Sequence, residues 1–185
     1  MILYIHGFNS SSRSGKAQQL KTWLAERGRE GEYRCPDLAH RPAQAIVQLE
    51  ALLAEHKGED VKLIGSSLGG FYATYLAERH GLKAALINPA VHANVLLKAA
   101  LGPQRNYSSG EEYFFTAEHL RELDELDLPR PRLLDHYLLL VETGDEVLDY
   151  REAVAYYAGC RQIVHPSGNH NYSRFLEDLP TILSF

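Results

Sequence analysis

A serine stands at the centre of the pentapeptide Gly65-Ser66-Ser67-Leu68-Gly69, which fits the pattern Gly-x-Ser-x-Gly. The apolar run before this pentapeptide predicts a strand, and the spacing of apolar residues after it predicts a helix. A serine on a sharp turn between a strand and a helix has crowded neighbours, so glycines are needed two residues to either side. A phosphate-binding loop is disfavoured because neither Gly-Lys-Ser/Thr nor Gly-x-Gly-x-x-Gly is present. We therefore predict a nucleophile elbow with Ser67 as the nucleophile, and a local hydrogen bond for Ser66.

A serine nucleophile requires a base, and the base requires an acid that orients it. In a parallel sheet these groups are expected in loops at the carboxyl ends of later strands, with the acid before the histidine. Asp145 comes two residues after an apolar stretch that ends at Thr143, and His170 lies in a Gly-Asn loop before the last expected helix. We predict that Asp145 is the acid and His170 the base.

Other ionisable residues close to these positions have more ordinary explanations. His165 stands directly before a proline at the end of an expected strand, which favours a structural role. Asp149 is a modest rival for the acid, although capping of a helix that begins at Tyr150 explains it better. Glu146 is expected to be solvated.

An oxyanion hole is the remaining part of such a site. An apolar run at residues 2–5 is followed by His6-Gly7-Phe8-Asn9. With a Gly-x-Ser-x-Gly turn, one donor is the N–H after the nucleophile and the other comes from a loop of this kind. We predict that Leu68 and Phe8 donate these N–H groups, and that Gly7 lets the backbone approach closely. His6 is expected to bond the loop rather than to take part in chemistry.

The elements that must position these residues alternate along the chain. Short apolar runs separated by helical patterns are typical of an α/β protein with a mostly parallel sheet and helices on both faces, a three-layer sandwich. One domain over residues 1–185 is expected. The predicted strands are residues 2–6, 33–35, 61–65, 83–89, 138–143 and 160–165.

One segment interrupts this alternation. Residues 91–130 contain no good strand pattern, so we expect a small helical, lid-like insert over the nucleophile. Two roles are open for its aromatic residues, which either line a pocket for the acyl or aryl group or pack the insert onto the body. These residues are Tyr107, Tyr113, Phe114 and Phe115.

Composition excludes several classes of protein. A formal charge of −5, without a run of basic residues, argues against a nucleic-acid partner. Cys35 and Cys160 have no C-x-x-C spacing and are expected to be buried free thiols. No metalloenzyme motif occurs, so no metal and no cofactor are expected. No apolar run approaches a membrane span and no signal-peptide pattern is present, which predicts a cytoplasmic protein without a membrane partner.

Together these stretches resemble the α/β-hydrolase superfamily, and within it the YqiA-like small esterases of bacteria. The resemblance is carried by LYIHGFNSSSRSGKAQQLKTWLAE, IGSSLGGFYATYLAE, INPAV, TGDEVLDYREAVAYYAGCRQ and GNH. It implies a minimal fold of about six strands that lacks the first two strands of the superfamily and has the short strand at 33–35 at its edge. It also implies a serine esterase with the triad Ser67, Asp145 and His170.

The resemblance further implies carboxylic esters, and acyl thioesters such as acyl-CoA, as small-molecule substrates. Two alternatives stay open at this point. One is an enzyme of the same fold with other chemistry, an acyltransferase or a C–C hydrolase. The other is a catalytically silent interaction module, which a fluorophosphonate would not label.

Overall fold

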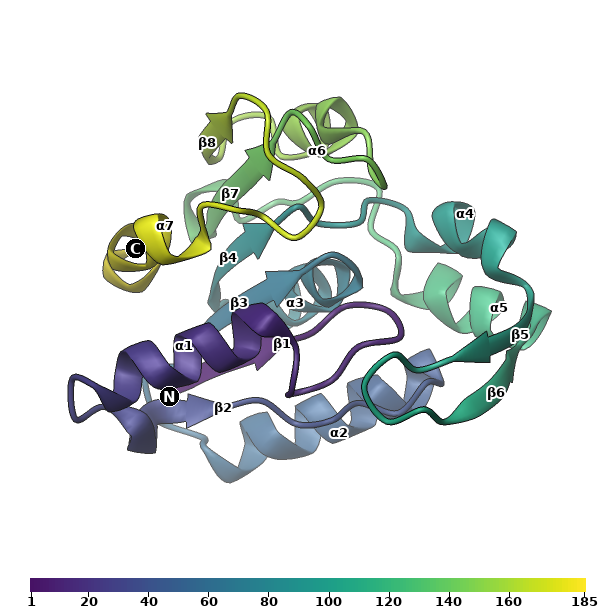
Figure 1. The fold of residues 1–185 in the computed structure, drawn as a ribbon, viewed down its shortest axis with the longest axis horizontal. Coiled ribbons are helices and arrows are strands. Elements are labelled where there is room, and N and C mark those ends of the chain that lie inside the picture. The colour runs from purple at the N-terminus through teal and green to yellow at the C-terminus, as the bar shows by residue number, and fades with distance from the viewer.

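The computed structural model describes all residues 1–185 and contains a central sheet of six strands (Figure 1). Neighbouring strands are parallel, and their order across the sheet is β2-β1-β3-β4-β7-β8. The strands are β1 (Ile2–Ile5), β2 (Tyr33–Arg34), β3 (Lys62–Ser66), β4 (Lys83–Ile87), β7 (Tyr137–Glu142) and β8 (Arg161–His165). The six predicted strands are confirmed, and the two-residue β2 forms one edge of the sheet as expected.

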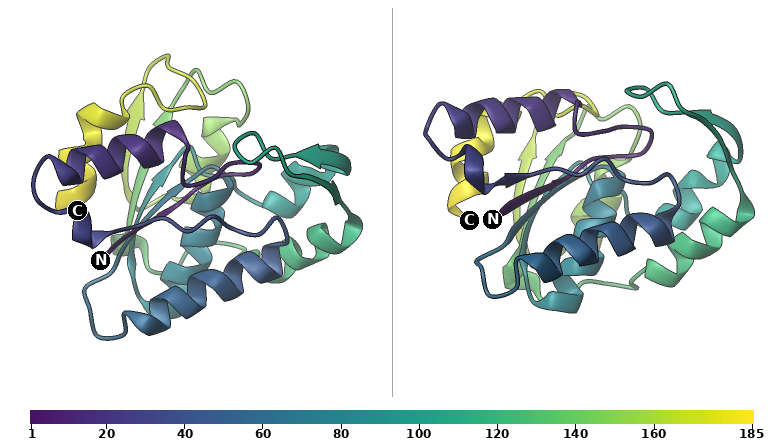
Figure 2. Two further views of the ribbon diagram at one scale, coloured as in Figure 1. Left: turned by 60° about the horizontal axis from the view of Figure 1, so that its bottom comes forward. Right: turned by 90° about the horizontal axis from the view of Figure 1, so that it is seen from below.

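Helices cover both faces of this sheet (Figure 2). The α-helices are α1 (Gly15–Ala25), α2 (Pro42–Glu55), α3 (Leu68–His80), α4 (Ala93–Leu96), α5 (Ala117–Leu126), α6 (Tyr150–Tyr156) and α7 (Phe175–Ser184). Three short 3-10 helices are η1 (Glu30–Glu32), η2 (Leu97–Ala100) and η3 (Leu134–His136). Helices α1 and α7 share one buried cluster with the sheet, and α2, α3 and α6 share another. None of the helices has the length and apolar character needed to cross a bilayer.

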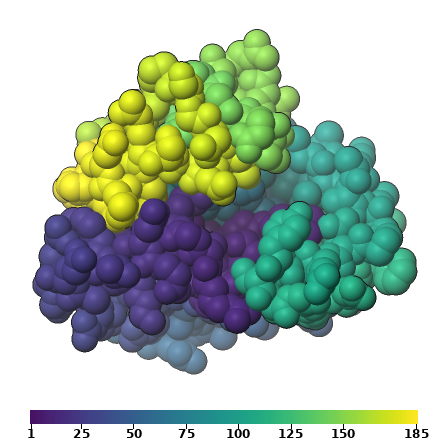
Figure 3. Space-filling model, in the orientation of Figure 1, coloured from purple at the N-terminus to yellow at the C-terminus, as the bar shows by residue number.

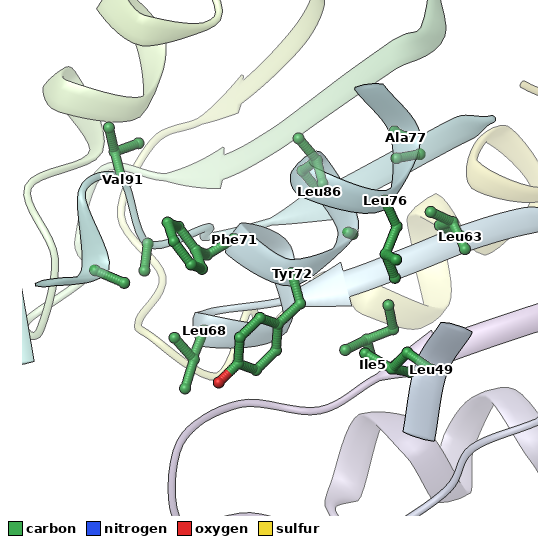
Figure 4. Close-up of a cluster of buried hydrophobic side chains, with 14 of the residues drawn as sticks. Ile5, Leu49, Leu63, Leu68, Phe71, Tyr72, Leu76, Ala77, Leu86 and Val91 are labelled. Atoms are coloured by element: carbon green, nitrogen blue, oxygen red, sulfur yellow. The ribbon is translucent and has the colours of Figure 1, made fainter. Parts of the chain in front are cut away.

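Helix α3 is held in place by an apolar contact that joins four elements (Figure 4). Leu76 of α3 lies among Leu63 of β3, Ile5 of β1 and Leu49 of α2, and none of these side chains has exposed surface. Burial of a leucine or isoleucine side chain stabilises a fold by roughly 1.5–3 kcal/mol. The contact therefore holds α3, which begins directly after Ser67, against β1 and β3.

The insert at residues 91–130 differs from the expected helical one. Besides α4 and α5 it contains β5 (Gly102–Arg105) and β6 (Glu112–Phe115), which pair as an antiparallel hairpin. The prediction that this segment has no strand was wrong. Strand β5 has no apolar run, and β6 offers only three aromatic residues, Tyr113 to Phe115, of which Phe115 alone is buried, so neither shows the pattern of a buried strand.

The hairpin is bonded to residues 6–14, which we call the β1 loop. The Tyr113 hydroxyl donates to Asn9 Oδ1 at 2.6 Å, and Asn9 Nδ2 donates to Gln104 Oε1 at 2.9 Å. The Tyr107 N–H donates to the Asn9 carbonyl at 2.9 Å. Figure 3 shows the hairpin lying against the N-terminal segment on this face of the molecule. The insert is thus attached to the same loop that carries the predicted oxyanion donor.

Both cysteines, Cys35 and Cys160, are free thiols as predicted, although they are half-buried rather than fully buried. Burial raises the pKa of each thiol to about 11. The thiols are therefore protonated at neutral pH and poor nucleophiles.

Candidate active site

Ser67 occupies a strained turn between β3 and α3. Its backbone angles are φ 55° and ψ −123°, a combination that residues with a side chain rarely adopt. A Cβ on Gly69 would overlap the carbonyl oxygen of Ile5 in β1, and a Cβ on Gly65 would lie 2.7 Å from the Cα of Gly70. Both glycines are therefore required by close backbone approach, as the Gly-x-Ser-x-Gly pattern predicts.

The three residues predicted to form a triad lie together as a hydrogen-bonded series. His170 Nε2 lies 3.1 Å from Ser67 Oγ, and His170 Nδ1 lies 2.9 and 2.8 Å from the two carboxylate oxygens of Asp145. With Nδ1 protonated and donating to the carboxylate, Nε2 can accept from the serine hydroxyl. The three side chains come from loops that follow β3, β7 and β8, at the carboxyl edge of the sheet.

The Asp145 carboxylate is held by more than the histidine. The N–H groups of Val147 and Leu148 donate to Asp145 Oδ1 at 2.8 and 2.9 Å. Burial acts to raise the pKa of Asp145, but the hydrogen bonds from His170, Leu148 and Val147 outweigh it and lower that pKa. Asp145 is therefore a carboxylate at neutral pH and can stabilise an imidazolium at His170.

Two backbone N–H groups beside Ser67 have no acceptor within the chain. They belong to Phe8 in the β1 loop and to Leu68, the first residue of α3. A Cβ on Gly7 would lie 3.2 Å from Ser67 Cβ and 3.6 Å from Ser67 Oγ, so the β1 loop passes directly beside the hydroxyl. Two unpaired donors at this position can stabilise a negative oxygen bound next to Ser67.

His6 has the structural position expected of it. It is buried, its Nδ1 lies 3.0 Å from the Gly7 carbonyl oxygen, and its Nε2 accepts from the Leu38 N–H at 3.1 Å. Burial lowers the pKa of His6, which favours the neutral ring. The ring thus ties the β1 loop to the segment after β2.

The rival residues lie away from Ser67. His165 Nε2 lies 2.8 Å from Asp178 Oδ2, and Asp149 Oδ1 accepts the Arg151 N–H at 3.0 Å as the cap of α6. Glu146 is exposed, but its carboxylate also accepts the His170 N–H at 2.9 Å. Glu146 is therefore solvent-exposed as predicted, and it has in addition an unpredicted contact that holds the backbone of the histidine.

A buried carboxylate that sequence reasoning missed holds the loop around His170. Glu142, the last residue of β7, has no exposed surface. Its Oε2 accepts the N–H groups of Asn169 at 2.7 Å and Ser173 at 3.0 Å. Its Oε1 accepts the Ser173 hydroxyl at 2.7 Å and the Arg174 N–H at 3.2 Å. Burial acts to raise the pKa of Glu142, but these hydrogen bonds prevail and lower it.

Asn88, after β4, supports the same loop from the other side. Its Nδ2 donates to the carbonyl oxygens of Asn169 at 3.1 Å and His170 at 3.2 Å. Its Oδ1 accepts the Glu142 N–H at 3.0 Å. The loop that carries His170 is therefore bonded to side chains from two neighbouring strand ends.

Backbone strain is gathered around these loops. All non-glycine residues with positive φ lie in the loops that follow β1, β3, β4 and β8. They are Asn9 (53°), Ser67 (55°), Asn88 (40°), His92 (52°), Ser167 (64°) and Tyr172 (57°). Because the strands are parallel, these loops share one edge of the sheet, and strain of this kind is typical of functional sites.

Ser67 and His170 open into a cleft of about 580 Å³. The cleft is lined by 16 residues, of which 4 are hydrophobic. Lys16 is the only lysine, arginine, aspartate or glutamate among them, and Tyr107 of the insert lies on the wall of the cleft. No three histidine, cysteine, aspartate or glutamate side chains gather in a group that could hold a metal ion.

The aromatic residues of the insert divide between the two roles left open for them. Tyr107 lines the cleft, whereas Phe114 is 69% exposed. Phe115 is buried and packs edge-on against Phe8 with ring centroids 5.4 Å apart. Packing thus explains Phe115, and Tyr107, although 85% exposed, is the only one of the four that lines the cleft containing Ser67.

The parallel sheet, the helices on both faces and the turn at Ser67 define an α/β-hydrolase fold, which confirms the predicted fold class. Mouse alpha/beta hydrolase domain-containing protein 10 superposes with a TM-score of 0.73 at 16% identity, covering 99% of this chain and 86% of that one. Est1E from Butyrivibrio proteoclasticus, solved with ferulic acid, gives 0.69 at 18% identity and covers 100% and 86%.

A family model described as "Uncharacterised protein family (UPF0227)" matches residues 1–185, and the chain belongs to this family. A UPF0227 protein from Pasteurella multocida is 24% identical over 188 residues, which covers 100% of this chain and 98% of the relative.

Proposed function

We propose that this protein is a serine esterase that hydrolyses carboxylic esters and acyl thioesters through Ser67, His170 and Asp145. The observation that carries the proposal is the hydrogen-bonded series from Ser67 Oγ through His170 to Asp145, next to two unpaired N–H groups. A nucleophile, a base, an acid and an oxyanion site are the parts that acyl transfer requires.

In the first half-reaction, Ser67 Oγ attacks the acyl carbonyl carbon while its proton moves to His170 Nε2. The carbonyl oxygen becomes an oxyanion that accepts from the N–H groups of Phe8 and Leu68. When the tetrahedral intermediate collapses, the proton on His170 passes to the leaving oxygen or sulfur, and the alcohol or thiol departs. Ser67 is then acylated.

In the second half-reaction, water attacks the acyl carbonyl and gives its proton to His170 Nε2. Collapse of the second intermediate returns that proton to Ser67 Oγ and releases the carboxylic acid. The Asp145 carboxylate stays ionised throughout, because its role is to hold Nδ1 protonated and to stabilise the imidazolium.

The fold of esterases among the structural neighbours supports the proposal. Est1E and an esterase domain of a Rhodothermus marinus protein share this arrangement of strands, the latter with a TM-score of 0.62 at 19% identity. Because that similarity concerns the fold, the assignment of chemistry depends on the geometry of Ser67, His170 and Asp145.

The test combines covalent labelling with turnover. A fluorophosphonate should label the wild-type protein, and peptide mass spectrometry should find the adduct on Ser67 rather than Ser66. Ser67→Ala should lose labelling and lower kcat for 4-nitrophenyl acetate by a factor on the order of 10⁴ to 10⁶. Ser66→Ala is the matched control and should still be labelled. A Ser67→Ala protein with near-normal turnover would refute the proposal, and product analysis with an added alcohol separates hydrolysis from acyl transfer.

A further inference from the structure

A lysine stands in the cleft beside the proposed nucleophile. Lys16 is the second residue of α1, and its side chain lines the same cleft as Ser67 and His170. Its Nζ donates one hydrogen bond, to the carbonyl oxygen of Asn171 at 2.9 Å. An ammonium has three N–H donors, so two remain for another acceptor.

No carboxylate of the chain pairs with this ammonium, because none of the ion pairs within 4.0 Å involves Lys16. The acids that interact electrostatically with Lys16 from a greater distance are Asp145 and Glu142, and both already accept hydrogen bonds from other groups. Asp145 is bonded to His170 and two backbone N–H groups, and Glu142 accepts four hydrogen bonds. The half-buried Lys16 is therefore a cation without a counter-ion.

The rest of the cleft does not suit a long hydrocarbon chain. Ligand pockets are usually lined mostly by apolar side chains, whereas here 12 of the 16 lining residues, the 16 less the 4 hydrophobic ones, are not hydrophobic. Neutral polar side chains such as Gln19, Asn171 and Ser173 lie on the wall together with Lys16. Neither aspartate nor glutamate is among the lining residues. This wall suits a small polar group that carries negative charge.

The position of Lys16 indicates which half of an ester it would meet. In the proposed reaction His170 Nε2 gives its proton to the leaving oxygen, so the alcohol half lies next to His170. Lys16 Nζ contacts the carbonyl of Asn171, the residue that follows His170. The N–H groups of Phe8 and Leu68, which would hold the carbonyl oxygen, belong to other segments. Lys16 therefore contacts the segment that carries His170, whose Nε2 faces the leaving group in the proposed reaction.

We propose that Lys16 binds an anionic group on the alcohol half of the substrate, so that the preferred substrates are esters of small alcohols that carry a carboxylate or a phosphate. The proposal rests on the proposed esterase function. It makes Lys16 a specificity-determining residue that contacts substrate without entering the chemistry of the ester bond.

The experiment uses three acetate esters of similar size, with acetate release as the readout. Butyl acetate is neutral, 4-acetoxybutanoate carries a carboxylate, and 3-acetoxypropyl phosphate carries a phosphate. In the wild-type protein, kcat/KM for at least one anionic ester should exceed that for butyl acetate by roughly 10-fold, the usual effect of one charge-assisted hydrogen bond. A preference for one anion over the other identifies the group that the site binds.

Two variants on the same helix separate the role of the charge from a structural role. Lys16→Met removes the ammonium and keeps most of the apolar stem, and it should bring the anionic-to-neutral ratio close to 1. Lys21→Met removes an exposed ammonium on α1 outside the cleft and should leave the ratio at the wild-type value.

Two results would overturn the proposal. One is a wild-type protein that hydrolyses neither anionic ester faster than butyl acetate. The other is a Lys16→Met protein in which all three rates fall equally, because Lys16 would then only hold the Asn171 carbonyl. Hydrolysis of butyl acetate that is lost in Ser67→Ala would show that the esterase function holds even when the preference fails. Absence of hydrolysis of every ester would refute both.

Discussion

Replacement of Glu142 by glutamine tests whether the buried carboxylate holds the loop that carries His170. The side chain keeps its shape but loses its charge and one of its two acceptor oxygens. If the amide nitrogen replaces Oε1, the Ser173 hydroxyl can turn to accept from it, but the Arg174 N–H loses its acceptor. If it replaces Oε2, the N–H groups of Asn169 and Ser173 both lose theirs.

The expected loss in the free energy of unfolding follows from the number of donors left without an acceptor. A buried donor without a partner costs roughly 1–3 kcal/mol, and the remaining bonds become weaker when the acceptor is neutral. We expect Glu142→Gln to lower the free energy of unfolding at pH 7 by about 2–4 kcal/mol. Because the donors belong to the loop around His170, kcat should also fall, by roughly 10- to 100-fold.

The difference in unfolding free energy between wild type and Glu142→Gln should depend on pH. The hydrogen bonds make the pKa of Glu142 lower in the folded protein than in the unfolded chain. Its contribution to stability is therefore full above the unfolded pKa, about 4.3, and is lost as pH falls through the folded pKa. The difference between wild type and Glu142→Gln should be largest near neutral pH and shrink below about pH 4.

The assay is urea unfolding followed by circular dichroism at a series of pH values, with kcat for 4-nitrophenyl acetate measured in parallel. Glu177→Gln is the matched control, because this exposed glutamate pairs with Arg174 at 3.1 Å on the surface. Exposed pairs contribute little, so its unfolding free energy should stay within about 0.5 kcal/mol of wild type. The reasoning fails if Glu142→Gln is equally stable at pH 7, or if its deficit is the same at every pH.

Three further predictions concern the nucleophile turn, the acid and the lysine. Gly69→Ala should lower the free energy of unfolding by about 3 kcal/mol or more, measured by thermal denaturation, because the new Cβ meets the Ile5 carbonyl. Asp145→Asn should lower kcat by roughly 10³- to 10⁴-fold, because its amide favours the tautomer of His170 that donates toward the serine. Burial lowers the pKa of Lys16 to about 8, against the carboxylates of the neighbouring loops, so the anionic-to-neutral preference should decline as pH rises through 8.

The fold was predictable where apolar residues cluster. Residues 2–5, 63–66 and 137–142 are continuous buried runs, and such runs in a parallel sheet can be read without knowledge of their partners. The hairpin of the insert was not predictable in this way. Its strands include the stretch Gly102–Arg105, whose side chains are half-buried or exposed, and their pairing depends on contacts with the β1 loop.

The residues of the candidate site likewise differ in whether the sequence alone predicts their roles. The pattern around Ser67 is local, and the order of acid and histidine after later strands follows from the topology of the sheet. Glu142 and Lys16 carry no local signal, because each acquires its role from residues far along the chain. Glu142 bonds Asn169, which stands 27 residues later, and Lys16 bonds Asn171 across 155 residues. For Glu142, the one sign in the sequence is that it is an acidic residue at the end of an otherwise apolar strand.

The clustering of positive φ angles at the carboxyl edge has a consequence for engineering a more heat-resistant form of this protein. Residues held there in strained conformations, such as Asn9 and Asn88, are bonded through their side chains to the insert and to the histidine loop. Exchanging them for relaxed alternatives would trade activity for stability. At the amino edge of the sheet there is no such conflict between activity and stability. Gly31, before β2, has open space where a methyl group would project, so alanine there is a sound starting point for a thermostable library.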